Sequence, residues 1–172
     1  MNNGDKIGSL YCYHNNQFHA HLHGLATPNG MAFSPDGRTM YLSDSHPTVQ
    51  KIWAFDFDII AGELSNRRIF LDMQHYAGRP DGATVDTDGC YWICAIDSGS
   101  ILRFSPQGQL LTRYDLPISK PSKCTFGGKD MKTLFVTSIK PQHPNELDGS
   151  LLAIQTPYQG IVESKVKPDA ID

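Results

Sequence analysis

Apolar residues along this chain fall in short runs that are separated by turn-forming residues. Three clear runs are TMYLSDS at 39–45, KIWAFDFD at 51–58 and CYWICAIDS at 90–98. Short runs rich in β-branched and aromatic residues, bounded by Gly, Pro, Asn and Asp, are typical of β-strands. The 15 glycines and 11 prolines are scattered along the chain, which argues against long helices. We therefore predict an all-β fold.

The runs recur as a repeat. Two Pro-X-Gly tripeptides, at 28–30 and 80–82, are each followed seven residues later by an X-Asp-Gly tripeptide, at 35–37 and 87–89. The same succession of three further strands then follows in both units. The sequence therefore indicates units of four strands each, in which the first strand begins at the Pro-X-Gly tripeptide.

A third, degenerate unit begins at Pro121, and its third strand is predicted at 150–155. Four short strands per unit, at a period of about 40–50 residues, are typical of β-propeller blades rather than of a sandwich or a helical solenoid. We predict a single domain over 1–172 that forms a partial propeller of about three and a half four-stranded blades. The expected blades are the end of one blade at 8–25, followed by 28–73, 80–117 and 121–166.

The two copies of Pro-Asp-Gly are predicted to differ in their roles. SPDGR at 34–38 is a hairpin turn between the first and second strands of its unit, because Asp-Gly supplies a residue with positive φ and Pro fixes the residue before it. The copy at 80–82 aligns instead with Pro-Asn-Gly at 28–30, at the start of an innermost strand. A repeat alignment therefore separates a turn from a candidate site.

Composition and charge exclude several classes of partner. Lys and Arg number 15 against 18 Asp and Glu, and neither sign is clustered, so we expect no nucleic acid and no anionic membrane surface as partner. No apolar window approaches the ~18 residues of a membrane span, and the N-terminal residues lack a signal-peptide pattern. Four cysteines without a CxxC motif fit reduced thiols. The expectation is a cytoplasmic protein.

Asn29 and Asp81 are the strongest candidates for chemistry. The repeat places both where an innermost strand begins, facing the central channel of a propeller, and a glycine follows each. A carboxamide and a carboxylate that converge there suit Ca²⁺, Mg²⁺ or Mn²⁺, and Zn²⁺ also accepts a carboxylate. The residues alone leave a second interpretation equally open, in which Asn-Gly and Asp-Gly are ordinary turn dipeptides.

Histidines and cysteines give weaker signals. His19, His21 and His23 share one face of a strand and could bind a transition metal, but a solvated strand face is favoured. Cys90 and Cys94 lie roughly 13 Å apart if they share a strand, too far for a disulfide. We expect both cysteines to be small apolar core residues.

Two aspartates end the second strands of their units. Asp44 in SDS and Asp97 in IDS could lie near the mouth of the same channel. Asx-type capping of a turn is the favoured interpretation for both. No Gly-x-Ser-x-Gly elbow, phosphate-binding loop or HExxH helix is present to indicate another kind of active site.

Five segments resemble, in order, the senescence-marker-protein/regucalcin/gluconolactonase family. They are TPNGMAFSPDGRTMYLSDS, KIWAFDFD, GRPDGATVDTDGCYWICAIDSG, ILRFSPQGQLLTRYDLP and CTFGGKDMKTLFVTS. The resemblance runs from about residue 8 to 155. It implies a six-bladed β-propeller with one divalent cation in the central channel, and hydrolysis of a sugar lactone such as gluconolactone.

The resemblance also implies roles for the two candidate residues. Asn29 and Asp81 match two metal ligands of the family, with Ca²⁺ favoured and Zn²⁺, Mn²⁺ and Mg²⁺ as alternatives. The implied reaction is attack of a metal-activated water on the lactone carbonyl, because a cation stabilises the developing negative charge and lowers the pKa of nearby water. Asp81 is the expected catalytic base. Related propellers also hydrolyse organophosphates.

This sequence departs from the family in length. Family members run to about 300 residues, and a glutamate metal ligand and the substrate-gripping residues have no counterpart here. We therefore expect a truncated chain that begins in mid-blade, with Met1 as an internal methionine. The alternative to an enzyme is a non-catalytic fragment or a calcium-binding or interaction module, which associates with itself or another chain through open propeller edges.

Overall fold

The computed structural model describes residues 6–14 and 16–164, and it confirms the predicted all-β fold. The start proposed at Met1 lies outside the described residues. Within these residues the secondary structure is arranged in four antiparallel sheets with one short 3-10 helix. The described part of the chain holds no helix of the length and apolar character that a membrane crossing needs.

Each sheet is an up-and-down meander in which neighbours in sequence are neighbours in the sheet. The first sheet consists of β1 (Gly8–His14) and β2 (Gln17–Leu25). The second contains β3 (Pro28–Phe33), β4 (Thr39–Asp44), β5 (Lys51–Asp58) and β6 (Glu63–Asp72), followed by helix η1 (Met73–His75). The third contains β7 (Arg79–Val85), β8 (Tyr91–Ile96), β9 (Ser100–Phe104) and β10 (Leu110–Asp115). The fourth contains β11 (Pro121–Gly127), β12 (Thr133–Ser138) and β13 (Leu151–Gln155).

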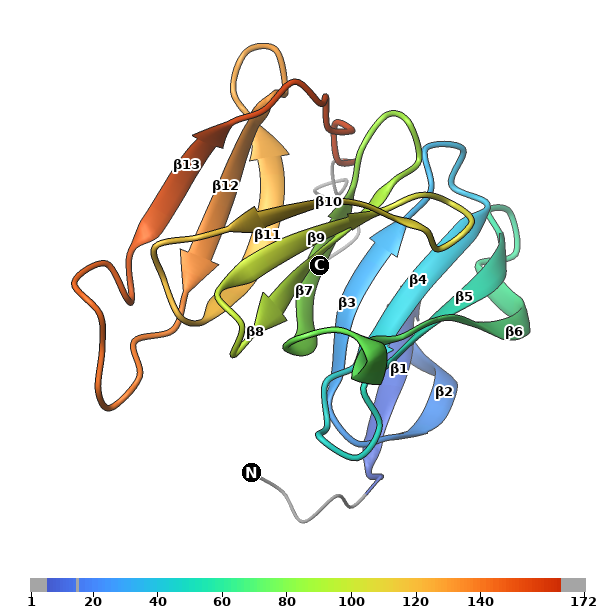
Figure 1. The fold of residues 1–172 in the computed structure, drawn as a ribbon. Helices are drawn as coiled ribbons and strands as arrows, with labels where there is room; N and C mark the ends of the chain where they lie inside the picture. Colours follow the sequence, from blue (N-terminus) through green and yellow to red (C-terminus); the bar gives the residue numbers. More distant parts are fainter. Residues whose placement is uncertain (1–5, 15, 165–172) are drawn as a thin grey trace.

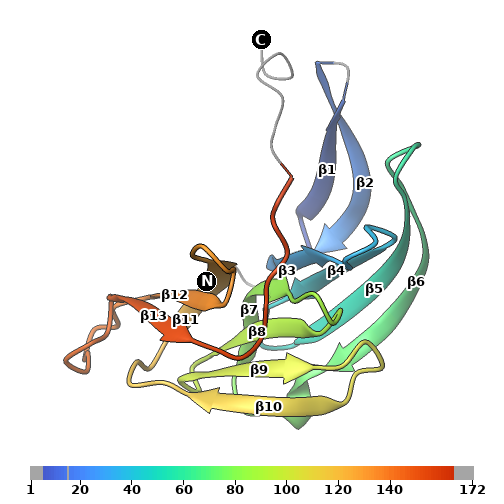
Figure 2. The same ribbon diagram turned by 90° about the horizontal axis from the view of Figure 1, so that it is seen from above.

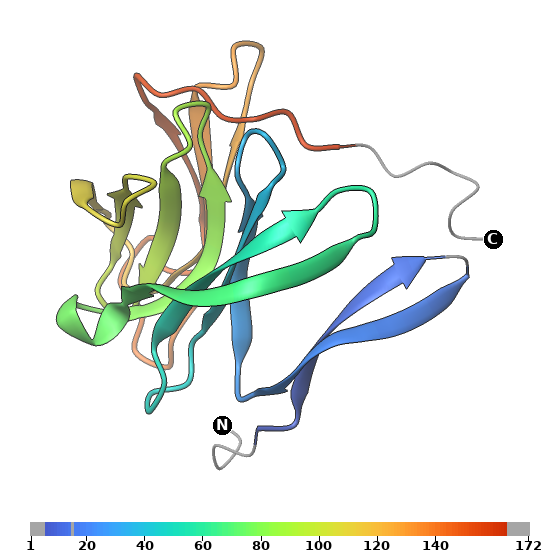
Figure 3. The ribbon, with the colours of Figure 1, turned by 90° about the vertical axis from the view of Figure 1, so that its right-hand side faces the viewer.

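The sheets follow one another like sectors of a fan (Figure 1). Seen from above, β3 and β7 lie near the centre, while β6 and β10 lie at the periphery (Figure 2). The hairpin of β1 and β2 projects away from the other three sheets (Figure 3). In the second and third sheets the first strand is therefore the innermost one, as the repeat predicts.

The turn predicted at 34–38 joins β3 to β4. The amide of Gly37 donates to the carbonyl of Ser34 at 2.8 Å, and Gly37 has a φ of 69°. One oxygen of the Asp36 carboxylate accepts from the Ser34 hydroxyl at 2.6 Å and from the Arg38 amide at 3.0 Å. This Pro-Asp-Gly copy is therefore a turn closed by its own side chains.

The hydrophobic core consists of layers between adjacent sheets, because side chains alternate between the two faces of each strand. On β8, Tyr91 and Ile93 pack toward the second sheet, whereas Trp92 and Cys94 pack toward the fourth. The side chains of β4 are distributed between two core layers in the same way. Its Tyr41 joins the layer against the third sheet, and its other apolar residues join the layer against β1 and β2.

The fourth sheet has three strands within the described residues, one fewer than the repeat predicts. Residues 156–164, which follow β13, do not turn back to pair with β13. They cross to the third sheet, where Gly160 forms a β-bridge with Asp86 and the Tyr158 ring packs against Trp92 and Arg103. Residues 165 and 166 of the predicted last blade lie outside the described residues.

Candidate functional site

Asn29 and Asp81 occupy equivalent positions at the start of neighbouring inner strands. In β3 the pairing with β4 is irregular between Asn29 and Ala32, and in β7 the pairing with β8 is irregular between Pro80 and Ala83. Such an irregularity bends a strand and redirects a side chain. Neither residue belongs to a closed turn, so the second Pro-Asp-Gly copy differs from the first, as predicted.

The two side chains touch. The Asn29 amide nitrogen donates a hydrogen bond to one oxygen of the Asp81 carboxylate, although the two residues are 52 positions apart in sequence. The Asn29 amide oxygen accepts from the Gly30 backbone at 2.9 Å. Both side chains are partly buried. The repeat alignment placed them in equivalent positions, and the structure joins them directly.

Gly30 shapes the strand next to Asn29. It has a φ of 56°, and a Cβ there would lie 2.5 Å from the Ser43 hydroxyl oxygen and 2.7 Å from the Tyr91 hydroxyl oxygen. The Tyr91 hydroxyl donates to the Gly30 carbonyl at 2.6 Å. A residue with a side chain would be strained here and would displace these two neighbours. Glycine therefore allows the third sheet to approach the backbone that carries Asn29.

Asp81 is also held by the sheets on both sides. The Ser45 hydroxyl donates to the Pro80 carbonyl, which ties the end of β4 to the start of β7. On the other side, a Cβ at Gly82 would lie 2.6 Å from the Ser122 carbonyl and 2.7 Å from the Lys123 Cα. The missing side chain of Gly82 therefore allows β11 to pack closely against β7.

Burial raises the pKa of the Asp81 carboxyl above its ordinary value, and the hydrogen bond from Asn29 works in the opposite direction. Arg79, whose positive charge also lowers this pKa, is engaged elsewhere. Its guanidinium pairs with Asp97 at 2.8 Å, and Lys120 pairs with the other oxygen of Asp97 at 2.6 Å. Asp81 is therefore a partly desolvated carboxylate without a direct cationic partner among the described residues.

The donor atoms of these two side chains are of the type that a hard divalent cation prefers. Carboxylate and carboxamide oxygens suit Ca²⁺ or Mg²⁺, and a cation would offset the desolvation of Asp81. In number they supply only part of a shell, because Ca²⁺ takes six to eight oxygen ligands. No group of three or more His, Cys, Asp and Glu residues is placed to hold a metal in 6–14 and 16–164. The remaining ligands of such a cation would be additional to these two side chains.

Ser122 is a site neighbour that sequence reasoning missed. It follows Pro121 at the start of β11, in the place that Asn29 and Asp81 occupy in β3 and β7, and the pairing of β11 is irregular there too. Its hydroxyl lies 2.9 Å from the Thr137 hydroxyl. The same repeat alignment could have found it, because the third unit also begins with Pro-X.

The two aspartates at the strand ends have different roles. Asp44 caps a turn as predicted, since its carboxylate accepts from the backbone amides of Ala26, Thr27 and His46 at 2.8–3.0 Å. The same prediction is wrong for Asp97, which forms the ion pairs with Arg79 and Lys120 instead. A lysine and an arginine far away in sequence outcompete the local backbone.

The remaining candidates behave as structural residues. His19 and His23 are exposed and His21 is partly buried, which fits a largely solvated strand face. Cys90 and Cys94 are buried and carry free thiols, as expected of core residues. A hydrogen bond between the thiols of Cys94 and Cys124, which lies in the next sheet, raises the pKa of the Cys94 thiol, and burial raises it further.

A cavity of about 740 Å³ runs beside the inner strands but is not lined by Asn29 or Asp81. Met31, Ala83, Lys123 and Thr125 contribute to its wall, together with the segment 161–164. The Lys123 ammonium group donates to the Ala83 carbonyl within it. Asn29 and Asp81 remain the candidate residues because of their contact and their donor atoms, not because of cavity size.

Comparison with known proteins identifies related sequences. The family model described as "SMP-30/Gluconolactonase/LRE-like region" matches residues 1–140. A 6-deoxy-6-sulfogluconolactonase of Pseudomonas putida is 37% identical over 142 residues, which cover 78% of this chain and 48% of that protein. Regucalcin of Danio rerio is 40% identical over 119 residues, which cover 69% of this chain and 40% of that protein. This chain thus spans about half the length of these relatives or less.

Comparison of structures supports the same grouping at the level of the fold. The crystal structure of a calcium-binding protein, regucalcin, from Agrobacterium tumefaciens superposes with a TM-score of 0.85 at 24% sequence identity. The match covers 92% of this chain and 56% of that one. At this identity the likeness concerns the arrangement of the sheets.

Proposed function

Because the chain belongs to the SMP-30/gluconolactonase/LRE-like family, we propose that Asn29 and Asp81 form part of the site of a sugar-lactone hydrolase that depends on a divalent cation. The observation that carries this proposal is the direct hydrogen bond between the Asn29 amide and the Asp81 carboxylate. The contact is made by the amide nitrogen of Asn29. Turning the carboxamide over would place its oxygen beside the Asp81 carboxylate, and two hard oxygen donors would then meet between adjacent inner strands. A related protein of Pseudomonas putida carries a lactonase name.

The proposed fold is a β-propeller in which the four sheets are successive blades. The blade boundaries at 8–25, 28–73, 80–117 and 121–166 amount to about three and a half blades of a six-bladed propeller. In this arrangement the first strand of every blade faces the central channel. Asn29 and Asp81 then lie on the channel wall, where a small sugar lactone can reach them.

The proposed location of the protein is the cytoplasm.

In the proposed reaction Asp81 acts as the general base. Its carboxylate accepts a proton from a water molecule whose oxygen attacks the lactone carbonyl carbon. The ring C–O bond then breaks, the ring oxygen takes up a proton, and the product is the open-chain hydroxy acid. Burial raises the pKa of Asp81 and so makes its carboxylate a stronger base than one in water.

Asn29 holds Asp81 in position for this step. Its amide nitrogen bonds one carboxylate oxygen, which leaves the other oxygen for water. With the Asn29 carboxamide turned over, its oxygen and the Asp81 carboxylate would hold a divalent cation, which would supply positive charge that stabilises the negative charge developing on the lactone carbonyl oxygen. Ca²⁺ is the preferred cation, with Zn²⁺, Mn²⁺ and Mg²⁺ as alternatives.

The test is hydrolysis of gluconolactone, followed by acid release at constant pH with added Ca²⁺ and with a chelator. We expect turnover that the chelator removes, and a loss of about 100-fold or more in Asp81→Asn because the general base is gone. Asp115→Asn, which changes an exposed carboxylate on β10, is the matched control and should retain activity. Chelator-resistant turnover, or full activity of Asp81→Asn, would contradict the proposal.

A second candidate is an interaction module without catalysis. The β1–β2 hairpin exposes Tyr11 and Phe18, which are 56% and 73% accessible, and Ile7 just before it is 81% accessible. A two-stranded sheet with an apolar surface and unpaired strand edges favours association with another chain. Mass measurement in solution separates the candidates, since assembly without lactone turnover would favour the module.

A further inference from the structure

Tyr41 on β4 carries a hydroxyl group that makes no hydrogen bond within the described residues, and its oxygen is accessible from a neighbouring cavity. The side chain is 4% accessible, and its ring packs against Phe70 and Tyr91 with centroids 4.8 and 5.0 Å apart. Tyr91 in the same cluster does have a partner, the Gly30 carbonyl. Burial raises the pKa of Tyr41, so its phenol stays neutral and protonated. The Tyr41 side chain is thus nearly covered, while its hydroxyl oxygen is left open to a ligand or to water.

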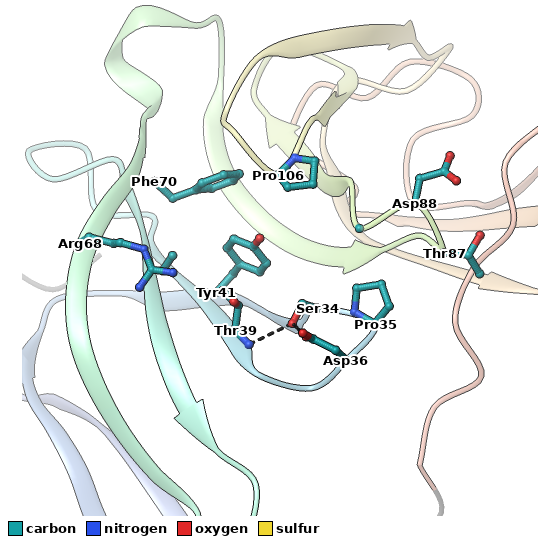
Figure 4. A pocket seen from close by; sticks show the side chains of 12 residues that line it. Ser34, Pro35, Asp36, Thr39, Tyr41, Arg68, Phe70, Thr87, Asp88 and Pro106 are labelled. Atoms are coloured by element: carbon teal, nitrogen blue, oxygen red, sulfur yellow. Dashed lines mark hydrogen bonds between the residues drawn. The ribbon is translucent and has the colours of Figure 1, made fainter.

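The Tyr41 hydroxyl faces a cavity of about 410 Å³ between the second and third sheets (Figure 4). This cavity lies at the turn that follows β3 and the turn that follows β7. Asn29 and Asp81 lie at the opposite ends of the same strands, about 16 Å away for a five-residue strand. The cavity is therefore distinct from the proposed lactonase site.

The cavity wall combines apolar faces with polar groups that both donate and accept. Phe70 and Pro106 offer apolar surfaces, and Asp36 and Asp88 offer carboxylates. The single cationic side chain of the lining, Arg68, is neutralised by Asp56, which lies 2.7 Å away. Hydroxyl groups are supplied by Tyr41, Thr39 and Thr87.

These features select among ligands. Arg68 is paired with Asp56 and Asp88 is paired with Arg103, so Asp36 carries the charge of the lining that no ion pair balances. This negative charge disfavours an anion. The apolar faces accept the C–H groups of a ring, and the mixed donors and acceptors match hydroxyl groups, which do both. A cavity of this volume is at the lower end of those that bind small molecules.

We propose that this cavity binds a neutral polyhydroxylated ring of monosaccharide size, with the Tyr41 hydroxyl bonded to one ligand hydroxyl. The ring lies against Phe70 and Pro106, and Asp36 accepts from a second hydroxyl. The site is separate from Asn29 and Asp81, so it does not depend on the proposed lactonase activity.

The test uses three matched probes and the whole chain. Glucose is the neutral ring, glucuronate is the same ring with a carboxylate, and cyclohexanol is a ring with one hydroxyl. Binding is followed by backbone amide shifts in ¹H–¹⁵N NMR spectra. We expect glucose to shift the signals of residues 34–41 and 87–89 with a millimolar Kd, as is usual for so small a polar ligand. Glucuronate and cyclohexanol should bind at least about tenfold more weakly.

Tyr41→Phe is the decisive variant, because it removes only the unpartnered hydroxyl. Its affinity for glucose should fall about tenfold, the effect of one lost hydrogen bond, while its thermal unfolding stays near that of the parent. Asp81→Asn should bind glucose like the parent. If Tyr41→Phe does not fold, Asp36→Asn tests the proposal instead. Removing the negative charge of Asp36 should reduce the difference in affinity between glucose and glucuronate.

Three results would overturn the proposal. They are the absence of shifts around the cavity with glucose, equal binding of cyclohexanol, and unchanged glucose affinity in Tyr41→Phe. With Asp36→Asn, an unchanged ratio of glucose to glucuronate affinity would likewise count against it.

Discussion

The Asn29 amide donates a hydrogen bond to the Asp81 carboxylate across the boundary between the second and third sheets. Each residue lies at an irregularity of an inner strand, and a glycine follows each one. The contact therefore depends on how closely the two sheets approach, which Gly30 permits. A change at this glycine should affect the pair without altering its chemistry.

Gly30→Ala should destabilise the protein more than Gly62→Ala. Both glycines have positive φ, 56° and 69°, so both substitutions carry the backbone strain of an L-residue. The added methyl group at 30 would also clash with Ser43 and Tyr91, whereas at 62 it meets nothing within 4 Å. We expect the difference in unfolding free energy, measured by urea denaturation, to be about 1–3 kcal/mol. Equal losses would show that the close approach at Gly30 is unimportant.

Among substitutions that break an ion pair of the described residues, Arg103→Ala should lower the free energy of unfolding most. Arg103 and Asp86 are almost fully buried and lie 2.8 Å apart, and the Trp92 indole donates to the same carboxylate oxygen. Removing the guanidinium leaves a buried carboxylate without its counter-ion, at a cost of about 3–5 kcal/mol.

Arg113→Ala is the control for that measurement. Arg113 and Asp115 form an exposed pair with the same charges at 2.6 Å, and such pairs contribute about 1 kcal/mol or less. Urea denaturation of both variants gives the comparison. A loss at Arg103 no larger than the one at Arg113 would refute the structural role of the buried pair.

Protonation of Asp148 should loosen the loop between β12 and β13. Its carboxylate accepts from the Ser119 amide at 2.6 Å, the Ser119 hydroxyl at 2.8 Å and the Asn145 amide at 2.8 Å. The Ser119 amide bond, followed by that from Asn145, lowers the pKa of Asp148 below 3.8. Because the folded-state pKa is lowered, this stabilisation is present above the unfolded-state pKa and is lost as pH falls through the folded-state value.

NMR titration of the Ser119 and Asn145 amide protons checks this dependence. Their signals should move with a common midpoint below 3.8, and Asp148→Asn should abolish that step. A midpoint at or above this value would show that the hydrogen bonds do not favour the carboxylate.

Local sequence patterns predicted the elements that local interactions determine. The turn at 34–38 was predictable because Ser34, Asp36 and Gly37 close it among themselves. The capping role of Asp44 follows the same logic, since its partners include the adjacent His46. The repeat also aligned Asn29 with Asp81, because both follow a proline at a strand start.

Long-range contacts could not be predicted in this way. The pairing of Asp97 with Lys120 joins residues 23 positions apart, and nothing around Asp97 marks Lys120 as a partner. The chain after β13 leaves its sheet to cover Trp92 with Tyr158, which a strand pattern does not encode. The unpartnered hydroxyl of Tyr41 is likewise invisible in sequence, where Tyr41 is one more aromatic residue in an apolar run.

Calcium binding by the paired side chains tests the central claim most directly. In ¹H–¹⁵N and side-chain amide NMR spectra, Ca²⁺ should shift the signals of Asn29, Gly30 and Asp81, and Asp81→Asn should remove these shifts because the carboxylate is the charged ligand. Asp115→Asn should respond like the parent, since Asp115 is exposed on β10. Saturable shifts at Asn29 and Asp81 that depend on the Asp81 carboxylate are the predicted result. Shifts that persist in Asp81→Asn, or that occur only at surface carboxylates, would contradict the account.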